Sequence, residues 1–219
     1  MAIQTLEAIL VELKHCLAMA AGFVVLIWLV HLLSVVFALD IHTYGVLPRD
    51  TTGLRGVLLG PFIHGSWQHL LSNTMPLLLL GTIMLYGNRN SRWWALAIIW
   101  QVSGLGVWFF ARDSYHFGAS GITHGLFYFL CLVGILRRDL RSVVLLMIAF
   151  YMYSTMLTSI FPRERGVSFE YHLFGALGGI LSAVLFRDTD RITRKKYAWQ
   201  TIDDSIEEDD PVIGDQWKL

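Results

Sequence analysis

Apolar residues fill long stretches of this chain, and polar residues collect mainly between them. A helix that crosses the hydrocarbon core of a bilayer needs about 20 apolar residues. Six stretches approach that length: residues 16–39, 69–86, 93–111, a fourth that ends at Leu136, 142–161 and 171–186. The pattern predicts an all-α membrane protein, a bundle of six transmembrane helices with a long outer loop between the first and the second.

The polar segments divide the chain into one membrane domain and two flanking pieces. Residues 40–67 form the long connector after the first span. We expect residues 16–187 to form a single domain, residues 1–15 an amphipathic lead-in at the cytoplasmic surface, and residues 188–219 a charged cytoplasmic tail. The tail is basic up to Lys196 and acidic afterwards, which is typical of either a disordered segment or a partner-binding one.

Composition agrees with a membrane protein. Only 16% of the residues are charged, 55% are hydrophobic and the mean hydropathy is +0.54, whereas roughly 25% of the residues of a soluble domain are charged. The two cysteines, Cys16 and Cys131, both lie within apolar stretches. This placement argues against a disulfide framework and against a zinc cluster.

Basic residues in short loops set the orientation of a membrane protein. With the N-terminus inside, Lys218 being set apart, eleven basic residues fall on the cytoplasmic side and five outside. The cytoplasmic set is Lys14, Arg89, Arg92, Arg137, Arg138, Arg141, Arg187, Arg191, Arg194, Lys195 and Lys196. The outer set is Arg49, Arg55, Arg112, Arg163 and Arg165. We therefore expect both termini to lie in the cytoplasm.

Four polar groups inside the spans fall at a common depth. Such groups are costly in a bilayer, and they commonly face a cavity and carry function. Counted from the basic residue that ends each span, Ser120 lies about 25 Å and His172 about 22 Å above the cytoplasmic boundary, at about 1.5 Å per helical residue. On the same scale Asn73 lies about 24 Å and His69 about 30 Å above it. These groups come from three spans and define one layer below the outer surface.

The residues of this layer suit acyl transfer by a serine. Gly118 and Gly121 flank Ser120 at the start of the fourth span, where the free N–H groups of a helix start can form an oxyanion hole. A serine is a weak nucleophile without a neighbouring base. His172 in the sixth span is the candidate base.

Small residues beside the base favour a close approach of the two spans. Gly175 and Gly179 follow His172 at helical spacing, and such faces permit tight helix packing. His69 and Asn73 are four residues apart, hence on one face of the second span, and both can donate to a developing oxyanion. Each motif alone is also explained by helix packing or by an internal hydrogen bond. Their combination at one depth favours catalysis.

These motifs resemble the rhomboid family of intramembrane serine proteases, over residues 16–187. The matching features are His69-xxx-Asn73, the GASG sequence around Ser120, His172-xx-Gly175-xxx-Gly179, the Leu54-Arg55 pair and the stretch GPFIHGSWQHLLSN at residues 60–73. The resemblance implies a Ser120–His172 dyad with no acidic third member, and an oxyanion hole made by the Ser120 backbone N–H, His69 and Asn73. It implies no cofactor.

The resemblance also implies partners and a location. The substrates would be transmembrane segments of other membrane proteins, partly unwound near the outer surface, and the protein would act within a lipid bilayer, that of a bacterial inner membrane. Access would run between the second and fifth spans, under the loop at residues 162–170. No nucleic-acid partner is implied. A metal site is not expected, because the sequence has no HExxH motif and the histidines of the spans lack carboxylate companions.

Several positions need separate interpretation. Leu54 stands where many relatives have tryptophan, and His124 stands where many have an aromatic residue that stacks on the catalytic histidine. His124 is four residues after Ser120 and faces the same way, so it either stacks on His172 or competes with it as a base; we favour stacking. A structural role is implied for His64. We expect His116, in the short outer loop, and Glu170, at the end of a span, to be solvated.

Two other functions fit parts of the pattern. A non-catalytic rhomboid-like protein that binds spans without cutting them should lack the serine or the histidine, and this chain has both. A channel or transporter would use the polar layer, but the sequence has no inverted repeat and no matching pair of broken helices. The sequence therefore favours the protease.

The charge bias leads to a test of topology. In a background without Cys16 and Cys131, a single cysteine placed in the 40–67 connector should react with a membrane-impermeant maleimide in intact cells, because this loop is expected to lie outside. A cysteine in place of Arg138 should stay unlabelled. The opposite labelling pattern would overturn the orientation and, with it, the common depth of the polar groups.

Overall fold

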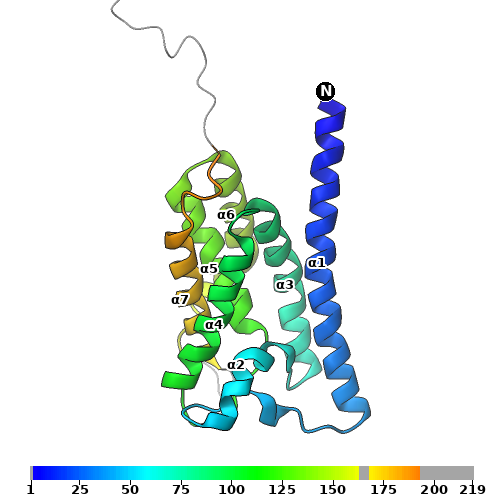
Figure 1. Cartoon of the computed structure of the whole chain (residues 1–219), viewed down its shortest axis with the longest axis vertical. Coiled ribbons are helices and arrows are strands. Elements are labelled where there is room, and N and C mark those ends of the chain that lie inside the picture. The colour runs from blue at the N-terminus through cyan, green and yellow to red at the C-terminus, as the bar shows by residue number, and fades with distance from the viewer. Residues whose placement is uncertain (1, 163–167, 193–219) are drawn as a thin grey trace, which may run out of the picture.

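The computed structural model describes residues 2–162 and 168–192, and within them the chain is helical, with no strand. The α-helices are α1 (Ala2–Val36), α2 (Arg55–Leu59), α3 (Trp67–Gly87), α4 (Arg92–Phe110), α5 (Ser120–Arg137), α6 (Leu140–Tyr153) and α7 (Phe169–Leu185). Short 3-10 helices are η1 (His42–Tyr44), η2 (Thr51–Leu54), η3 (Gly60–Phe62) and η4 (Ser154–Leu157). Figure 1 shows the long helices running side by side, with α1 at one edge.

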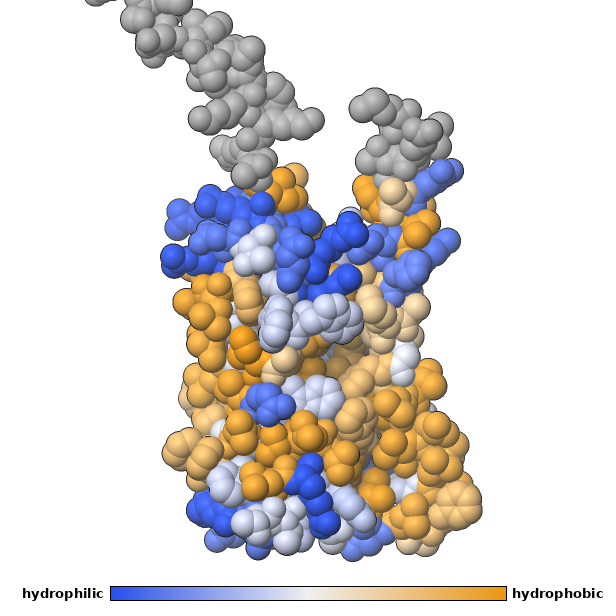
Figure 2. Space-filling model, in the orientation of Figure 1, coloured by the Kyte–Doolittle hydropathy of each residue, from blue (hydrophilic) through white to orange (hydrophobic). Residues whose placement is uncertain are grey.

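The long helices form a multi-pass membrane bundle. Five of the described helices, with α6 extended to Leu157, are long and apolar enough to cross a bilayer, and α7 is an apolar helix of 17 residues. At about 1.5 Å per residue, α7 is about 25 Å long, close to the thickness of a hydrocarbon core. An apolar band lies between two hydrophilic ends (Figure 2). The predicted fold class is therefore confirmed.

The N-terminal residues and the first span form one helix. Helix α1 runs without a break from Ala2 to Val36, so the secondary structure has no boundary at residue 15. Continuous backbone hydrogen bonding through apolar residues explains this continuity, because nothing between the lead-in and the first span breaks a helix. The position of residues 1–15 relative to a membrane surface stays a prediction.

The connector between α1 and α3 is folded against α4 at the outer end of the bundle. The indole N–H of Trp108 donates to the carbonyl of Asp50 at 2.8 Å, and that of Trp100 donates to the carbonyl of Val57 at 2.9 Å. A Cβ atom at Gly104 would lie 2.9 Å from Cα of Val57. The backbones of α2 and α4 therefore touch, and the connector is a fixed cap.

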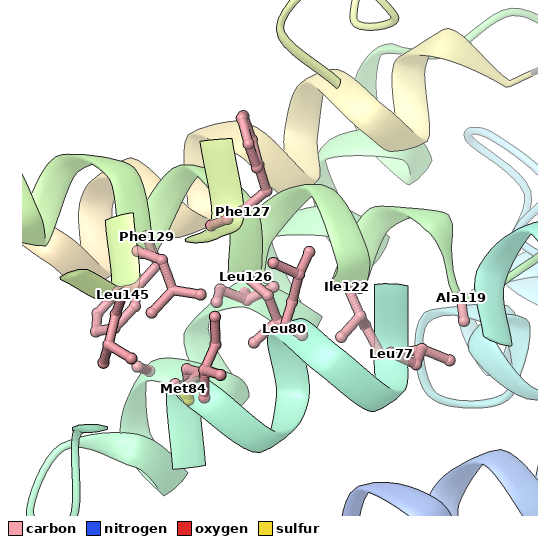
Figure 3. Packing of buried hydrophobic residues seen from close by; sticks show 14 of the residues in the cluster. Leu77, Leu80, Met84, Ala119, Ile122, Leu126, Phe127, Phe129 and Leu145 are labelled. Carbon is pink, nitrogen blue, oxygen red and sulfur yellow. The ribbon is translucent and has the colours of Figure 1, made fainter. Parts of the chain in front are cut away.

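Helix α5 lies at the centre of the bundle. Of its 18 residues 72% are buried, against 11% in the span that contains α6. Ile122 and Leu126 of α5 face Leu77 and Leu80 of α3 in the apolar core (Figure 3). Both faces of α5 are therefore covered by protein, which allows this helix to carry polar residues at its outer end.

Glycines bring α5 and α7 into backbone contact. A Cβ atom at Gly175 would lie 2.0 Å from the carbonyl oxygen of Gly121, and one at Gly179 would lie 2.2 Å from that of Gly125. Real side chains never approach so closely, so only glycine fits at these points. The small-residue face predicted after His172 is therefore present, and it packs on α5.

Polar groups join the ends of α3, α5 and α7 at the end of the bundle opposite Ser120. Arg137 at the end of α5 is 2% exposed. Its guanidinium donates to Oδ1 of Asn88 at 2.7 Å and to the carbonyls of Phe186 and Arg187 at 2.8 and 2.7 Å. We expected Arg137 to be an anchor at the membrane surface, but its side chain is buried within the protein. The last carbonyls of α7 have no partners within their own helix, and Arg137 supplies the missing hydrogen bonds.

Asp190 completes this inner network. Its carboxylate accepts from the backbone N–H groups of Asn90 and Ser91 at 3.0 and 3.1 Å and from the Ser91 hydroxyl at 2.6 Å. Its carbonyl accepts from Arg141 at 2.6 Å. The first residues of the expected tail are thus part of the folded domain. Residues 193–219, which hold the rest of that tail, lie outside the described part of the chain.

The glycine contact leads to a stability test. Gly179→Ala should destabilise the protein by about 1–3 kcal/mol, because the new methyl group forces apart two backbones that already touch. Gly22→Ala is the matched control, since a Cβ atom at Gly22 meets nothing within 4 Å. That change should be neutral, or stabilising by up to about 1 kcal/mol. The measurement is the unfolding midpoint in detergent, and equal midpoints for the two variants would contradict the packing.

Candidate active site

Ser120 is the first residue of α5 and lies behind a glycine with an unusual backbone. Gly118 has a φ of +114°, a region that residues with a Cβ rarely adopt. This turn lets the chain leave the outer loop and enter the helix at Ser120. The N-cap residue Ala119 makes no side-chain hydrogen bond, whereas Ser66 and Ser168 cap α3 and α7 with their hydroxyls. The first N–H groups of α5 have no partner inside the helix and no side-chain cap.

His172 lies in the first turn of α7, at the same end of the bundle. The contact of Gly175 with Gly121 fixes the level of α7 against α5. Ser120 precedes Gly121 by one residue and His172 precedes Gly175 by three, so both lie just above this contact. Both side chains are buried, with 8% and 9% exposure.

His124 contacts both Ser120 and His172. Its ring stacks on that of His172, with centroids 3.9 Å apart and an angle of 8° between the planes. Nδ1 of His124 lies 2.7 Å from the carbonyl oxygen of Ser120. The stacking that we favoured is therefore present.

Ser159, just beyond η4, contacts both histidines and was missed in the sequence. Its hydroxyl lies 2.7 Å from Nε2 of His124, and its carbonyl oxygen lies 3.0 Å from Nδ1 of His172. A signal was present, because Ser159 is a polar residue near the outer end of the predicted fifth span. Only the second, fourth and sixth spans end at the basic residues from which depth can be counted, and Ser159 lies in the fifth.

The second span brings His69 and Asn73 to the same end of the bundle. A Cβ atom at Gly118 would lie 2.6 and 2.7 Å from Cε1 and Nε2 of His69, so the imidazole lies directly against the turn before Ser120. The amide of Asn73 is buried and donates to the carbonyl of His69 at 3.0 Å. An amide nitrogen carries two N–H donors, and this bond uses one.

A buried histidine supports His69 from the loop before α3. The His64 ring lies 5.0 Å from the His69 ring, and the His64 carbonyl accepts from Nδ1 of His31 at 3.0 Å. Burial lowers the pKa of His64 to about 3, helped by the neighbouring His69. His64 is therefore neutral at physiological pH, and its contacts are those of a structural residue.

Two residues that we expected to be solvated are buried. His116 is 1% exposed, its Nδ1 lies 2.6 Å from the hydroxyl of Ser168, and burial lowers its pKa. The His116 backbone pairs with Val46, which draws the ring under the connector. Glu170 is 6% exposed and forms an ion pair with Arg112 at 3.4 Å. Both predictions were wrong because the connector pairs with the His116 backbone and Arg112 lies against Glu170.

Histidine is abundant at this site, yet the geometry does not suit a metal. Within residues 2–162 and 168–192, no three histidine, cysteine or carboxylate side chains converge as ligands. His124 and His172 face each other ring to ring, whereas metal ligands point ring nitrogens at a common centre. The arrangement instead offers a serine hydroxyl, an imidazole and a set of N–H donors.

Comparison with known proteins identifies the family. A family profile described as Rhomboid domain matches residues 51–189. An uncharacterised protein of Mycobacterium tuberculosis and one of Mycobacterium bovis are each 34% identical to this chain over 181 residues, covering 78% of it and 75% of their own length. An uncharacterised protein of Mycobacterium leprae is 30% identical over 181 residues, covering 78% and 72%. No solved structure matches. This chain belongs to the rhomboid family.

Proposed function

We propose that this protein is an intramembrane serine endopeptidase that hydrolyses peptide bonds in or near the transmembrane segments of other membrane proteins. One observation carries the proposal: α5 and α7 touch through glycines at the level of Ser120 and His172, and His124 bonds to the first and stacks on the second. A nucleophile, a base and oxyanion donors at one end of a membrane bundle are the parts that acyl transfer requires.

In the proposed reaction, Ser120 attacks the scissile carbonyl and His172 takes the hydroxyl proton on Nε2. His172 then gives this proton to the leaving amine, and the C–N bond breaks. A water molecule, deprotonated by the same imidazole, hydrolyses the acyl-enzyme and restores Ser120. The dyad needs no acidic third member, because the Ser159 carbonyl takes the position of the group that orients the base.

The oxyanion would be held by groups that gather at the start of α5. These are the backbone N–H of Ser120, the second N–H of the Asn73 amide and the ring of His69. The uncapped start of α5 supports this role, because preorganised donors without partners stabilise developing negative charge strongly in a water-poor site.

The proposed site opens to the outer side of a bacterial inner membrane, with both termini in the cytoplasm. The excess of basic residues at the inner loops supports this orientation, and the mycobacterial relatives support a bacterial membrane. Substrates would enter between α3 and α6, under the loop that follows the fifth span. Residues 163–167 of that loop lie outside the described part of the chain.

The packing below the site favours a one-sided cavity over a channel. Towards the cytoplasm, α3 and α5 are joined by Leu80, Met84, Leu126 and Phe129 (Figure 3). Such a close-packed apolar core leaves no polar path for an ion or solute. The layer of polar residues therefore does not continue through the bundle. Hydrolysis at a single depth needs a polar layer of this kind.

The dyad can be tested by mutation. Ser120→Ala and His172→Ala should each abolish cleavage of a membrane substrate, and the double variant should be no worse than either, because the two groups act as one unit. Labelling of purified protein by a fluorophosphonate should also disappear in both. Ser182→Ala, a buried serine at the inner end of α7, is the control and should keep labelling. Persistent labelling of His172→Ala would show that another group activates the serine.

The oxyanion donors generate a separate prediction. Asn73→Ala should lower kcat by about 100- to 1,000-fold, the usual effect of losing one such donor, with little change in KM, because the bond forms fully only in the transition state. Ser72→Ala is the matched control, since Ser72 donates to the same His69 carbonyl at 2.8 Å from an exposed position. If both variants kept normal turnover, Asn73 would be a packing residue.

A further inference from the structure

Ser159 touches both histidines of the candidate site through different atoms. Its carbonyl lies at the edge of His172, and its hydroxyl lies at the edge of His124, which in turn covers one face of His172. Ser159 thus contacts the edge of the His172 ring directly. It also bonds to His124, which covers one face of that ring.

The carbonyl contact determines which nitrogen of His172 carries the proton. A carbonyl oxygen accepts and never donates, so Nδ1 of His172 must carry the hydrogen of this 3.0 Å bond. In a neutral imidazole the other nitrogen is then bare. Nε2 of His172 is therefore the basic atom, which is the state that a general base must have before reaction.

The hydroxyl contact removes His124 from competition as a base. Nδ1 of His124 must donate to the carbonyl of Ser120, so in the neutral ring Nε2 is the acceptor. The Ser159 hydroxyl has one hydrogen and two acceptors within reach, Nε2 of His124 at 2.7 Å and the Met156 carbonyl at 3.3 Å, and we assign the hydrogen to the shorter bond, to His124. Both nitrogens of the buried ring are occupied. His124 holds a fixed orientation and presents its face to His172.

The segment that carries Ser159 packs Met156 against the apolar core and is also bonded to α5 through side chains. Ser159 follows η4, where the Tyr128 hydroxyl donates to the carbonyl of Leu157 at 3.3 Å. The bond from Ser159 to His124 is shorter, at 2.7 Å. Loss of the Ser159 hydroxyl would therefore loosen the segment and shift the carbonyl that orients His172.

We propose that Ser159 is a positioning residue for the base, holding His172 in the Nδ1–H form with its backbone carbonyl and locking that carbonyl in place through its hydroxyl bond to His124. The proposal rests on the proposed function, since it assigns His172 the role of base. It assigns to the Ser159 carbonyl the role that an acidic residue has in a triad, which is to orient the base. It also assigns His124 a second role, because the bond of His124 to the Ser159 hydroxyl holds the segment after η4.

The test compares four variants of the full-length protein in detergent. Ser159→Ala should lower both kcat and the rate of fluorophosphonate labelling by about 10- to 100-fold, the range for loss of a buried hydrogen bond that positions a reacting group, with KM unchanged. Ser159→Thr keeps the hydroxyl and should restore most of the rate. Ser154→Ala removes the same atom at the start of η4 and should behave like wild type. His124→Phe keeps a stacking ring but loses this bond together with the one to the Ser120 carbonyl, so it should be at least as slow as Ser159→Ala.

Two further measurements separate positioning from general damage. The double variant Ser159→Ala with His124→Phe should be no slower than His124→Phe alone, because the bond that Ser159→Ala breaks is already absent in that variant. The ¹⁵N spectrum of the histidine rings should show His172 protonated at Nδ1 in wild type and a mixture of tautomers in Ser159→Ala, at an unchanged unfolding midpoint.

The possible failures are distinguishable. Wild-type rates in Ser159→Ala, additive losses in the double variant, or an unchanged His172 tautomer in Ser159→Ala would each overturn the positioning role. Wild-type protein that neither cleaves nor labels would instead refute the proposed function, and the ring spectrum, which does not depend on activity, would still report whether Ser159 sets the tautomer.

Discussion

The backbone contact between α5 and α7 is the constraint on which the rest of this structure depends. Gly121 and Gly125 meet Gly175 and Gly179 so closely that any side chain at the latter two would collide with a carbonyl oxygen. Packing in a bilayer has no hydrophobic driving force between helices, so close van der Waals contact stabilises the pair. The level of His172 relative to Ser120 follows from this contact.

The groups of the candidate site come from the starts of three different helices. The outer ends of α3, α5 and α7 each bring one kind of group: donors from α3, a hydroxyl from α5 and an imidazole from α7. Each group lies in or next to the first turn of its helix, and only the start of α5 has no side-chain cap on its N–H groups. Below this level the same helices turn apolar and fill the core.

Much of this arrangement could be predicted from the sequence because membranes impose strong rules. Apolar length predicted the spans, and the shared depth of Ser120 and His172 predicted that they belong together. Sequence reasoning failed where the decisive contact is tertiary. Nothing local distinguishes His116, which is covered by the connector, from a solvated loop histidine, and Arg137 has the pattern of a surface anchor although Asn88 and the end of α7 surround it.

The inner network of Arg137 and Asp190 also has a mechanical consequence for the far end of α7. The helix is tied at its foot to α5 and to the turn between α3 and α4, so a tilt that opened the Gly175 contact would pivot about that foot. From Phe186 to His172 the lever arm is about 21 Å at 1.5 Å per residue. A tilt of about 5° would carry His172 sideways by about 2 Å, more than a hydrogen bond tolerates. Asp190 and Arg137 at one end of the bundle thus influence, through the length of α7, where the His172 imidazole lies near the other end.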